Sequence, residues 1–266
     1  MTNPRQNPTA GGWGHLLQKP LHALLDLIYP LRCAACAVRL TDSGDARTDF
    51  CPGCAAELVP VKLPFCDTCG EPFAGGMTAP FKCPNCAGLR FDFDFAISAW
   101  LSTGPLRQAI HRFKYQRCLH LRAALARRLH DAVADSRLVE MHAPDAAERW
   151  CVVPVPLHSR RRRERGFNQS AELARLLARA TGLPFRDLLR RSRYTTAQAR
   201  LDRKERLANL AGAFRPARQA VRHLQGKNVL LIDDVFTTGS TTHECAAVLK
   251  KSTHAAKVIV LTVARG

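Results

Sequence analysis

Two carboxylates and a run of small hydroxyl residues stand close together near the end of the sequence. Asp233 and Asp234 follow the aliphatic residues 229–232, and the segment Thr-Thr-Gly-Ser-Thr occupies 237–241. Such a turn ahead of a helix offers free backbone N–H groups and the positive end of the helix dipole, which suits a phosphate. The carboxylates instead accept hydrogen bonds from neutral hydroxyls, such as those of a sugar. The combination predicts a sugar phosphate as the ligand.

The elements around this stretch predict a parallel α/β sheet. Four consecutive aliphatic residues, 229–232, are typical of a strand buried on both faces. Residues 150–156 and 258–264 have the same character, and a helical pattern extends from the turn to about Lys251. The alternative is a Rossmann-type turn that carries acidic residues at a strand end and binds no ligand.

The stretch resembles the 5-phosphoribosyl-1-pyrophosphate (PRPP) motif of type I phosphoribosyltransferases. The resemblance implies that Asp233 and Asp234 bind the ribose hydroxyls of PRPP, which is accompanied by Mg²⁺. It also implies that the 5′-phosphate is held by Thr237, Thr238, Gly239, Ser240 and Thr241. Purine-salvage relatives carry an Asp in the place of Thr237, where it exchanges a proton with the purine, so hypoxanthine and guanine are disfavoured as acceptors here.

A cluster of arginines follows the predicted strand 150–156. Five of the six residues 160–165 are Arg, and such crowding favours an anionic partner. In type I phosphoribosyltransferases the loop after the first core strand binds pyrophosphate, and the resemblance implies this role for Arg161, Arg163 and Arg165. The alternatives are a solvated basic loop and a nucleic-acid contact.

Eight of the eleven cysteines form four Cys-x-x-Cys pairs, which are Cys33/Cys36, Cys51/Cys54, Cys66/Cys69 and Cys83/Cys86. Two such pairs complete a tetrahedral site, and the separations between them are close to those of zinc ribbons. We expect two structural Cys₄ zinc sites, paired either in sequence order or in a cross-braced manner. An iron–sulfur cluster and redox-active thiol pairs are the alternatives.

The chain of 266 residues is long enough for an α/β domain and a small accessory module. We predict an N-terminal amphipathic helix within residues 1–30, a double zinc ribbon over 31–90 and a phosphoribosyltransferase-like domain over 91–266. The sequence has no apolar run that could span a membrane and no signal-peptide pattern, so a cytoplasmic protein is expected.

The net charge of +18 is concentrated in the second part of the chain. Residues 1–90 contain 8 Lys or Arg against 7 Asp or Glu, whereas 91–266 contain 32 against 15. A polyphosphate substrate or a polyanionic partner fits this excess, and a solvated basic surface is the alternative.

Three further segments are assigned from their patterns. Residues 91–100 alternate as a strand, and a helix whose polar side includes Lys114 begins near Leu106. The role of Lys114 is left open. Residues 188–214, rich in Arg, occupy the position of the mobile hood that closes over the active site in type I phosphoribosyltransferases.

Taken together, these motifs resemble the ComF/GntX family of bacterial proteins, which combine a double zinc ribbon with a phosphoribosyltransferase-like domain. The resemblance rests on the Cys-x-x-Cys pairs, Val-Pro-Val-Pro at 153–156, Arg-Gly-Phe-Asn-Gln at 165–169, the segment Gln198 to Phe214, and the motif at 233–241. It implies a role in natural competence or in the use of external DNA.

Three functions are therefore compatible with these motifs. The first is transfer of phosphoribosyl from Mg-PRPP to an unknown acceptor. The second is a non-catalytic protein that keeps the PRPP pocket and binds single-stranded DNA through its basic surface. In the third, the zinc module is a docking platform for proteins of the DNA-uptake machinery.

Overall fold

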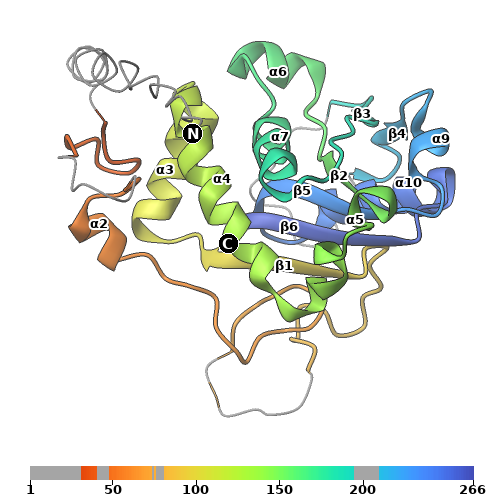
Figure 1. Cartoon of the computed structure of the whole chain (residues 1–266), viewed down its shortest axis with the longest axis horizontal. Coiled ribbons are helices and arrows are strands. Elements are labelled where there is room, and N and C mark those ends of the chain that lie inside the picture. The colour runs from red at the N-terminus through yellow and green to blue at the C-terminus, as the bar shows by residue number, and fades with distance from the viewer. Residues whose placement is uncertain (1–30, 41–47, 74, 76–80, 195–209) are drawn as a thin grey trace, which may run out of the picture.

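A parallel sheet forms the centre of the molecule. The computed structural model describes residues 31–40, 48–73, 75, 81–194 and 210–266. Figure 1 shows the four-stranded sheet, in the order β1-β6-β5-β2, with each neighbouring pair parallel. The strands are β1 (Phe95–Leu101), β2 (Trp150–Pro154), β5 (Asn228–Phe236) and β6 (Lys257–Arg265). A separate antiparallel pair consists of β3 (Leu189–Arg191) and β4 (Phe214–Pro216).

Helices cover both faces of this sheet, so the predicted α/β class is confirmed. One face packs against α3 (Gly104–Tyr115), α4 (Arg122–His130) and α7 (Gln169–Thr181). The other packs against α9 (Ala220–Leu224) and α10 (Ser240–Thr253). The remaining short elements are α2 (Pro52–Ala56), α5 (Ala146–Arg149), α6 (Ser159–Arg165) and the 3-10 helices Leu119–Leu121, Asp131–Ala134 and Ser136–His142.

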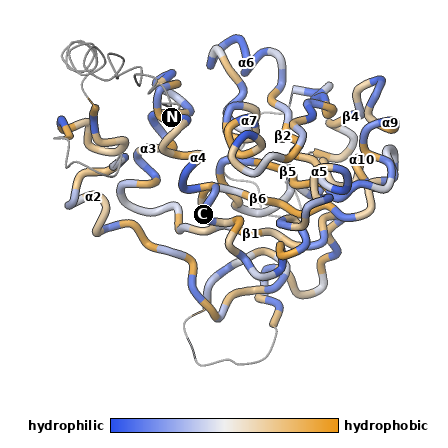
Figure 2. Tube along the Cα trace, in the orientation of Figure 1, coloured by the Kyte–Doolittle hydropathy of each residue, from blue (hydrophilic) through white to orange (hydrophobic). Residues whose placement is uncertain are grey.

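The predicted central strand is longer than its aliphatic run. Residues 229–232 are fully buried, because helices lie over both faces of β5. The strand continues to Phe236, so Asp233 and Asp234 lie inside the strand near its carboxyl end and not beyond it. Figure 2 shows the central strands as mainly hydrophobic and α6 as mainly hydrophilic.

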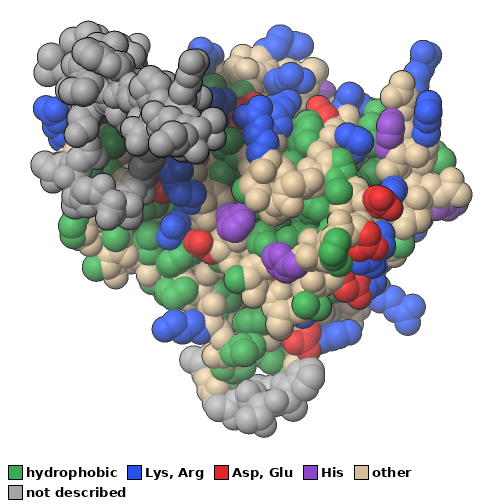
Figure 3. Space-filling model, in the orientation of Figure 1, with side chains coloured by type: hydrophobic (Ala, Val, Ile, Leu, Met, Phe, Trp, Pro, Cys, Tyr) green, Lys and Arg blue, Asp and Glu red, His purple; other side chains and the backbone are tan. Residues whose placement is uncertain are grey.

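The arginine-rich segment 160–165 is a helix, and the prediction of a loop there is wrong. Arginine has a high helix propensity, and Arg160 forms an i,i+4 ion pair with Glu164 at 3.2 Å. Gly166 ends α6 in the left-handed conformation with φ 86°, which glycine adopts without strain. Figure 3 shows Lys and Arg side chains gathered over this part of the surface.

The two halves of the ribbon segment pack on opposite faces of the sheet. Cys33 and Phe50 join the apolar core under α3 and α4, whereas Cys66 and Cys83 join the core under α10. The domain boundary between residues 90 and 91 stays a prediction. The predicted amphipathic helix within residues 1–30 and most of the predicted hood, 195–209, lie outside the described residues.

The connectivity creates a crevice between β2 and β5. The helix α7 follows β2 on one face, and α10 follows β5 on the opposite face. In open parallel sheets, ligands bind at such a switch point, outside the carboxyl ends of the strands. Both predicted binding segments, 160–165 and 237–241, leave the sheet at this edge. In the described part of the chain, no helix has the length and apolar character to cross a membrane.

Candidate functional site

A pocket of about 380 Å³ opens at this crevice. The acidic pair, Asp233 and Asp234, lies on one wall, and side chains of α3 and α6 lie on the others. The polar and charged residues that line it are Ser102, Arg107, His111, Lys114, Tyr115, Arg161, Arg165, Asn168, Gln169, Ser170, Arg191, Asp233, Asp234, Thr237 and Thr241. The structure thus brings together residues from four separate parts of the sequence.

The two carboxylates of the acidic pair are held by different partners. Ser170 Oγ donates a hydrogen bond to Asp233 Oδ1 at 2.8 Å, and the Asp234 amide donates to the same oxygen at 2.9 Å. Asp234 is 6% exposed, and its Oδ1 lies 2.8 Å from Lys114 Nζ. Both side chains are therefore oriented before any ligand arrives.

Burial and the neighbouring Asp234 raise the pKa of Asp233 to about 6, although Lys114 and the Ser170 hydroxyl act to lower it. Burial lowers the pKa of Lys114, but its attraction to Asp234 outweighs burial and leaves that pKa above its ordinary value. Lys114 thus remains charged, and the acidic pair shares one counter-ion from α3.

The segment 237–241, here called the phosphate loop, forms a second and smaller hollow. This hollow of about 40 Å³ is lined by residues 237–242 together with Asp233, Val235 and Phe236. Gly239 is the N-cap of α10 and has φ 77°, and a Cβ on it would lie 2.7 Å from Cζ of Phe236. The first N–H groups of α10 have no partner within the helix, so they are available to an anion.

The hydroxyls of the phosphate loop are arranged locally. Thr238 Oγ1 and Ser240 Oγ lie 3.0 Å apart, and Thr242 Oγ1 donates to the Gly239 carbonyl at 3.0 Å. Thr237 and Thr241 also line the larger pocket. The two hollows therefore share a wall, with the acidic pair beside the phosphate loop.

Two of the three predicted arginines belong to this pocket. Arg161 and Arg165 line it, whereas Arg163 is exposed and is not among the residues that line it. Arg165 donates to Gln169 Oε1 at 3.0 Å, and its guanidinium lies 5.0 Å from the centre of the Tyr115 ring. Helical phase explains the split, since residues 161 and 165 lie on the same face of a helix and 163 points away.

The sequence did not single out several residues of the pocket. No sequence signal gives a site role to Arg107 or Tyr115, Ser170 is only a candidate cap for the helix that begins near residue 170, and the partner of Lys114 lies 120 positions away in the chain. The arginine pattern along α3 and the helix start near Ser170 were visible, but no sequence signal relates them to β5.

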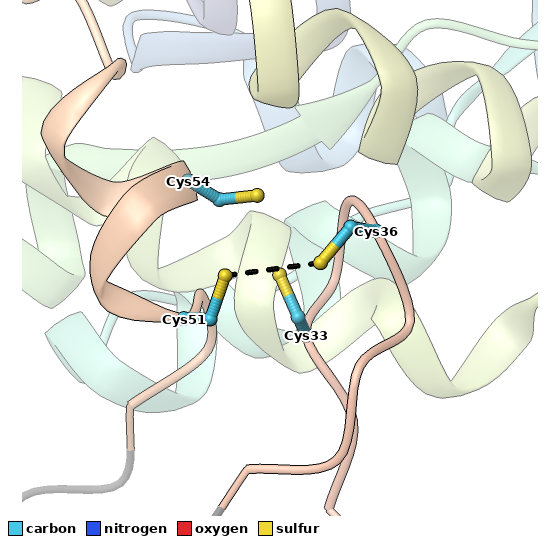
Figure 4. Close-up of side chains that lie close together, drawn as sticks. All are labelled: Cys33, Cys36, Cys51 and Cys54. Atoms are coloured by element: carbon cyan, nitrogen blue, oxygen red, sulfur yellow. Dashed lines mark hydrogen bonds between the residues drawn. The ribbon is translucent and has the colours of Figure 1, made fainter.

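Eight cysteines form two clusters in sequence order, which excludes the cross-braced alternative. The first knot is Cys33, Cys36, Cys51 and Cys54, and the second knot is Cys66, Cys69, Cys83 and Cys86. Within each, the four Sγ atoms lie within 4.8 Å of one another. Figure 4 shows the four sulfur atoms of the first knot converging on one point.

The geometry of both knots fits zinc. A tetrahedral ion with Zn–S bonds of about 2.3 Å requires sulfur atoms about 3.8 Å apart. The Sγ atoms of Cys36 and Cys51 are 3.7 Å apart, and those of Cys69 and Cys83 are 3.6 Å apart. Four thiolates leave no open position, so a zinc ion held here would be structural.

Thiolates are favoured at one position in each knot. Burial acts to raise the pKa of Cys33, but backbone N–H groups of Cys51, Cys36 and Ala35 lower it to about 6. A hydrogen bond from the Cys86 thiol, against the effect of burial, lowers the pKa of Cys69 to about 5. Each knot therefore has one sulfur atom that ionises readily, and binding of zinc would have to ionise the remaining ligands.

Comparisons with known proteins agree with the cysteine pattern. A family model described as "Double zinc ribbon domain" matches residues 24–88. Competence protein F of Haemophilus influenzae is 31% identical over 225 residues, which are 84% of this chain and 92% of that protein. The DNA utilization protein YhgH of Salmonella typhi is 34% identical over 228 residues, which are 85% and 93% of the two chains.

Two more distant similarities were found. Competence protein ComFC of Bacillus subtilis is 26% identical over 252 residues, which are 90% of this chain and 96% of that protein. Among solved structures, an allosteric regulatory enzyme of purine biosynthesis overlays 54% of this chain and 26% of its own, with a TM-score of 0.32 and 20% identity. That overlay is too small to support a functional statement. The relatives over most of the chain, the double zinc ribbon and the motif at 233–241 together establish that this chain belongs to the ComF/GntX family of competence and DNA utilization proteins.

Proposed function

We propose that this protein binds PRPP with Mg²⁺ in the pocket between β2 and β5 and transfers its phosphoribosyl group to a nucleophile. The observation that supports this most is the shared wall of the two hollows, because it sets the acidic pair next to the phosphate loop. A ribose 5-phosphate has its hydroxyls and its phosphate on such neighbouring positions.

The charge of the pocket supports a polyphosphate ligand. Five cationic side chains line it against the two carboxylates, and these are Arg107, Lys114, Arg161, Arg165 and Arg191. A sugar that carries both a phosphate and a pyrophosphate matches this excess of positive charge. A neutral nucleoside or a simple sugar has no negative charge to match this excess.

Each group has a defined task in the proposed reaction. Asp233 and Asp234 accept hydrogen bonds from the ribose hydroxyls and fix the ring, and the phosphate loop anchors the 5′-phosphate. Arg161 and Arg165 face the pyrophosphate and stabilise the charge that develops as it leaves C1. The carboxylate oxygens are ligand atoms of the kind that Mg²⁺ prefers, and the ion would neutralise part of the negative charge of the pyrophosphate.

Catalysis would thus depend on positioning of the substrate and on stabilisation of charge, because loss of pyrophosphate needs little proton transfer. The nucleophile remains unidentified. Thr237 stands where a purine-specific relative carries an acid, and Thr cannot exchange a proton with a purine ring at neutral pH. We therefore expect an acceptor other than hypoxanthine or guanine.

The test is release of pyrophosphate from Mg-PRPP in the presence of a panel of bases and amines. Turnover with one acceptor that is abolished in Asp234→Asn supports the proposal. Asp145→Asn is the control, since Asp145 lies on the surface in an exposed ion pair with Arg149 and should leave the rate unchanged. No pyrophosphate with any acceptor contradicts the transferase function.

A second candidate is a PRPP-binding protein without turnover that holds single-stranded DNA. The exposed residues Arg162 and Arg163 of α6 favour it, because they lie outside the pocket and extend its positive charge over the surface. The relatives named for competence and DNA utilization agree with this role. Binding of a fluorescent single strand that weakens steeply as salt rises, together with PRPP binding but no pyrophosphate release, would favour this candidate.

A further inference from the structure

We infer that the second knot positions the phosphate loop through an ion pair between Glu71, which is partly exposed, and the buried guanidinium of Arg265. The inference rests on the proposed function only in naming the loop's ligand, since the mechanical link itself does not depend on PRPP. Arg265 is consequently a positioning residue, and the two knots have different tasks although their ligands are alike.

Arg265 is an unusual arginine because it is 5% exposed at the end of β6. Its Nη2 forms an ion pair with Glu71 Oε2, and its Nη1 donates to the Phe236 carbonyl at 3.0 Å. The guanidinium carbon also lies 5.3 Å from the centre of the Phe236 ring. A buried guanidinium is stable only where such partners surround it, and Glu71 is the partner that supplies the opposite charge.

Phe236 connects Arg265 to the phosphate loop. It is the last residue of β5 and is 1% exposed. Its ring lies directly against Gly239, where a Cβ would meet it at 2.7 Å. Gly239 in turn is the N-cap of α10. A displacement of Phe236 would therefore move the residue that aims the first N–H groups of α10 at the bound phosphate.

Glu71 is held by the second knot itself. It follows Cys69 by two residues, and its carbonyl accepts a hydrogen bond from the Cys66 amide at 2.8 Å. Thr68, between these cysteines, accepts a hydrogen bond from the Ala96 amide of β1 at 2.9 Å. When zinc leaves such a knot the turn loses its cross-link, and the place of Glu71 is no longer fixed.

The first knot has a different set of contacts. Arg112 of α3 donates to the carbonyls of Ala34 and Ala35 at 2.9 and 3.1 Å, and Arg127 of α4 forms an ion pair with Asp49. Within the described ranges, these contacts lead to α3 and α4 and not to the phosphate loop. The pair Asp49–Arg127 is thus a matched control for Glu71–Arg265, because both join a ribbon to the main sheet assembly.

The experiment compares Glu71→Gln with Asp49→Asn in the full-length, zinc-loaded protein. Amide hydrogen exchange by mass spectrometry follows residues 236–242, and calorimetry measures the affinity for Mg-PRPP. We expect Glu71→Gln to raise the exchange rate in this segment about tenfold and to weaken the affinity for Mg-PRPP about tenfold. Both changes are within the range typical of coupled sites. We expect Asp49→Asn to change neither. Elemental analysis should find two zinc ions per chain in both variants if all eight cysteines are ligands.

Cysteine variants test the origin of the effect. Cys83→Ser and Cys51→Ser should each lose one zinc, but only Cys83→Ser should speed exchange at 236–242. If Glu71→Gln does not fold, Arg265→Lys replaces it, because lysine keeps the charge and loses the planar donor pair. Unchanged exchange in Glu71→Gln, or equal changes for the two knots, overturns the inference. A wild type that fails to bind Mg-PRPP contradicts the proposed function, while the exchange data still decide the inference.

Discussion

Lys114 Nζ lies 2.8 Å from Asp234 Oδ1, so a lysine of α3 holds one carboxylate of the acidic pair on β5. The lysine side chain is 20% exposed and that of Asp234 is 9% exposed. This contact supplies the counter-charge without which two adjacent carboxylates would repel each other at the bottom of a pocket. It also means that the proposed ribose site has one cation of its own, which is Lys114.

Lys114→Gln is expected to destabilise the protein by roughly 2 kcal/mol, which is less than the loss of one partner of a fully buried pair. The variant leaves Asp234 without its cation, and its affinity for Mg-PRPP should fall about tenfold because the pocket loses positive charge. Urea unfolding and calorimetry measure the two effects. Lys250→Gln is the control, since Lys250 forms an exposed ion pair with Asp94 at 3.0 Å and its loss should cost under about 1 kcal/mol. Equal effects in the two variants would contradict the role given to Lys114.

The raised pKa of Asp233 predicts a characteristic pH dependence of stability. Its pKa is about 6 in the folded protein against an ordinary value of 3.8, so the folded state binds the extra proton between these values. The free energy of unfolding must therefore fall as pH rises from about 4 to 6, by about 3 kcal/mol from this group alone. Unfolding of the wild type and of Asp233→Asn across this range isolates the contribution. Asp233→Asn should gain stability relative to the wild type as pH rises. Parallel plots of the free energy of unfolding against pH would rule out the raised pKa of Asp233.

Gly239 should be irreplaceable in the phosphate loop. Gly239→Ala introduces a left-handed alanine and a Cβ 2.7 Å from the Phe236 ring, so a loss of at least about 2 kcal/mol and of Mg-PRPP binding is expected. Gly182→Ala is a matched control, because Gly182 also has a positive φ, 73°, but no atom within 4 Å of its Cβ position. That change should cost about 1 kcal/mol and leave binding intact. Thermal unfolding and calorimetry separate the two outcomes.

Substitutions of Arg161 and Arg163 should have different effects on the affinity for Mg-PRPP, although only two positions separate the residues. Arg161→Ala removes a guanidinium from the pocket and is expected to weaken binding of Mg-PRPP about tenfold, through the loss of a charge-assisted contact to pyrophosphate. Arg163→Ala changes an exposed side chain outside the pocket and should leave the affinity within about twofold. Calorimetry at fixed salt compares them. Equal losses would mean that α6 acts only through its overall charge.

The central strand and the turn that follows it could be predicted because their signals are local. Residues 229–232 predict a doubly buried strand on their own, and the phosphate loop is one continuous segment. The cysteine spacing predicted two metal sites but left their pairing open, since either pairing satisfies a tetrahedron. The fold settles the pairing by placing the two knots on opposite faces of the sheet.

The parts that could not be predicted depend on contacts between distant segments. Nothing near Lys114 or Arg265 in the sequence indicates a partner at Asp234 or Glu71, because these pairs form only when the sheet assembles. The helix α6 is a different case. Its Arg160–Glu164 spacing and the following Gly166 are local helix signals, so this helix is predictable from the sequence alone.

Isothermal titration of the wild type with PRPP in the presence of Mg²⁺ decides whether the pocket between β2 and β5 binds this ligand. We predict one binding event per chain, with a heat that disappears in Asp234→Asn and is kept in the surface control Asp145→Asn. Absence of any heat of binding for the folded, zinc-loaded wild type, or undiminished binding to Asp234→Asn, would contradict it.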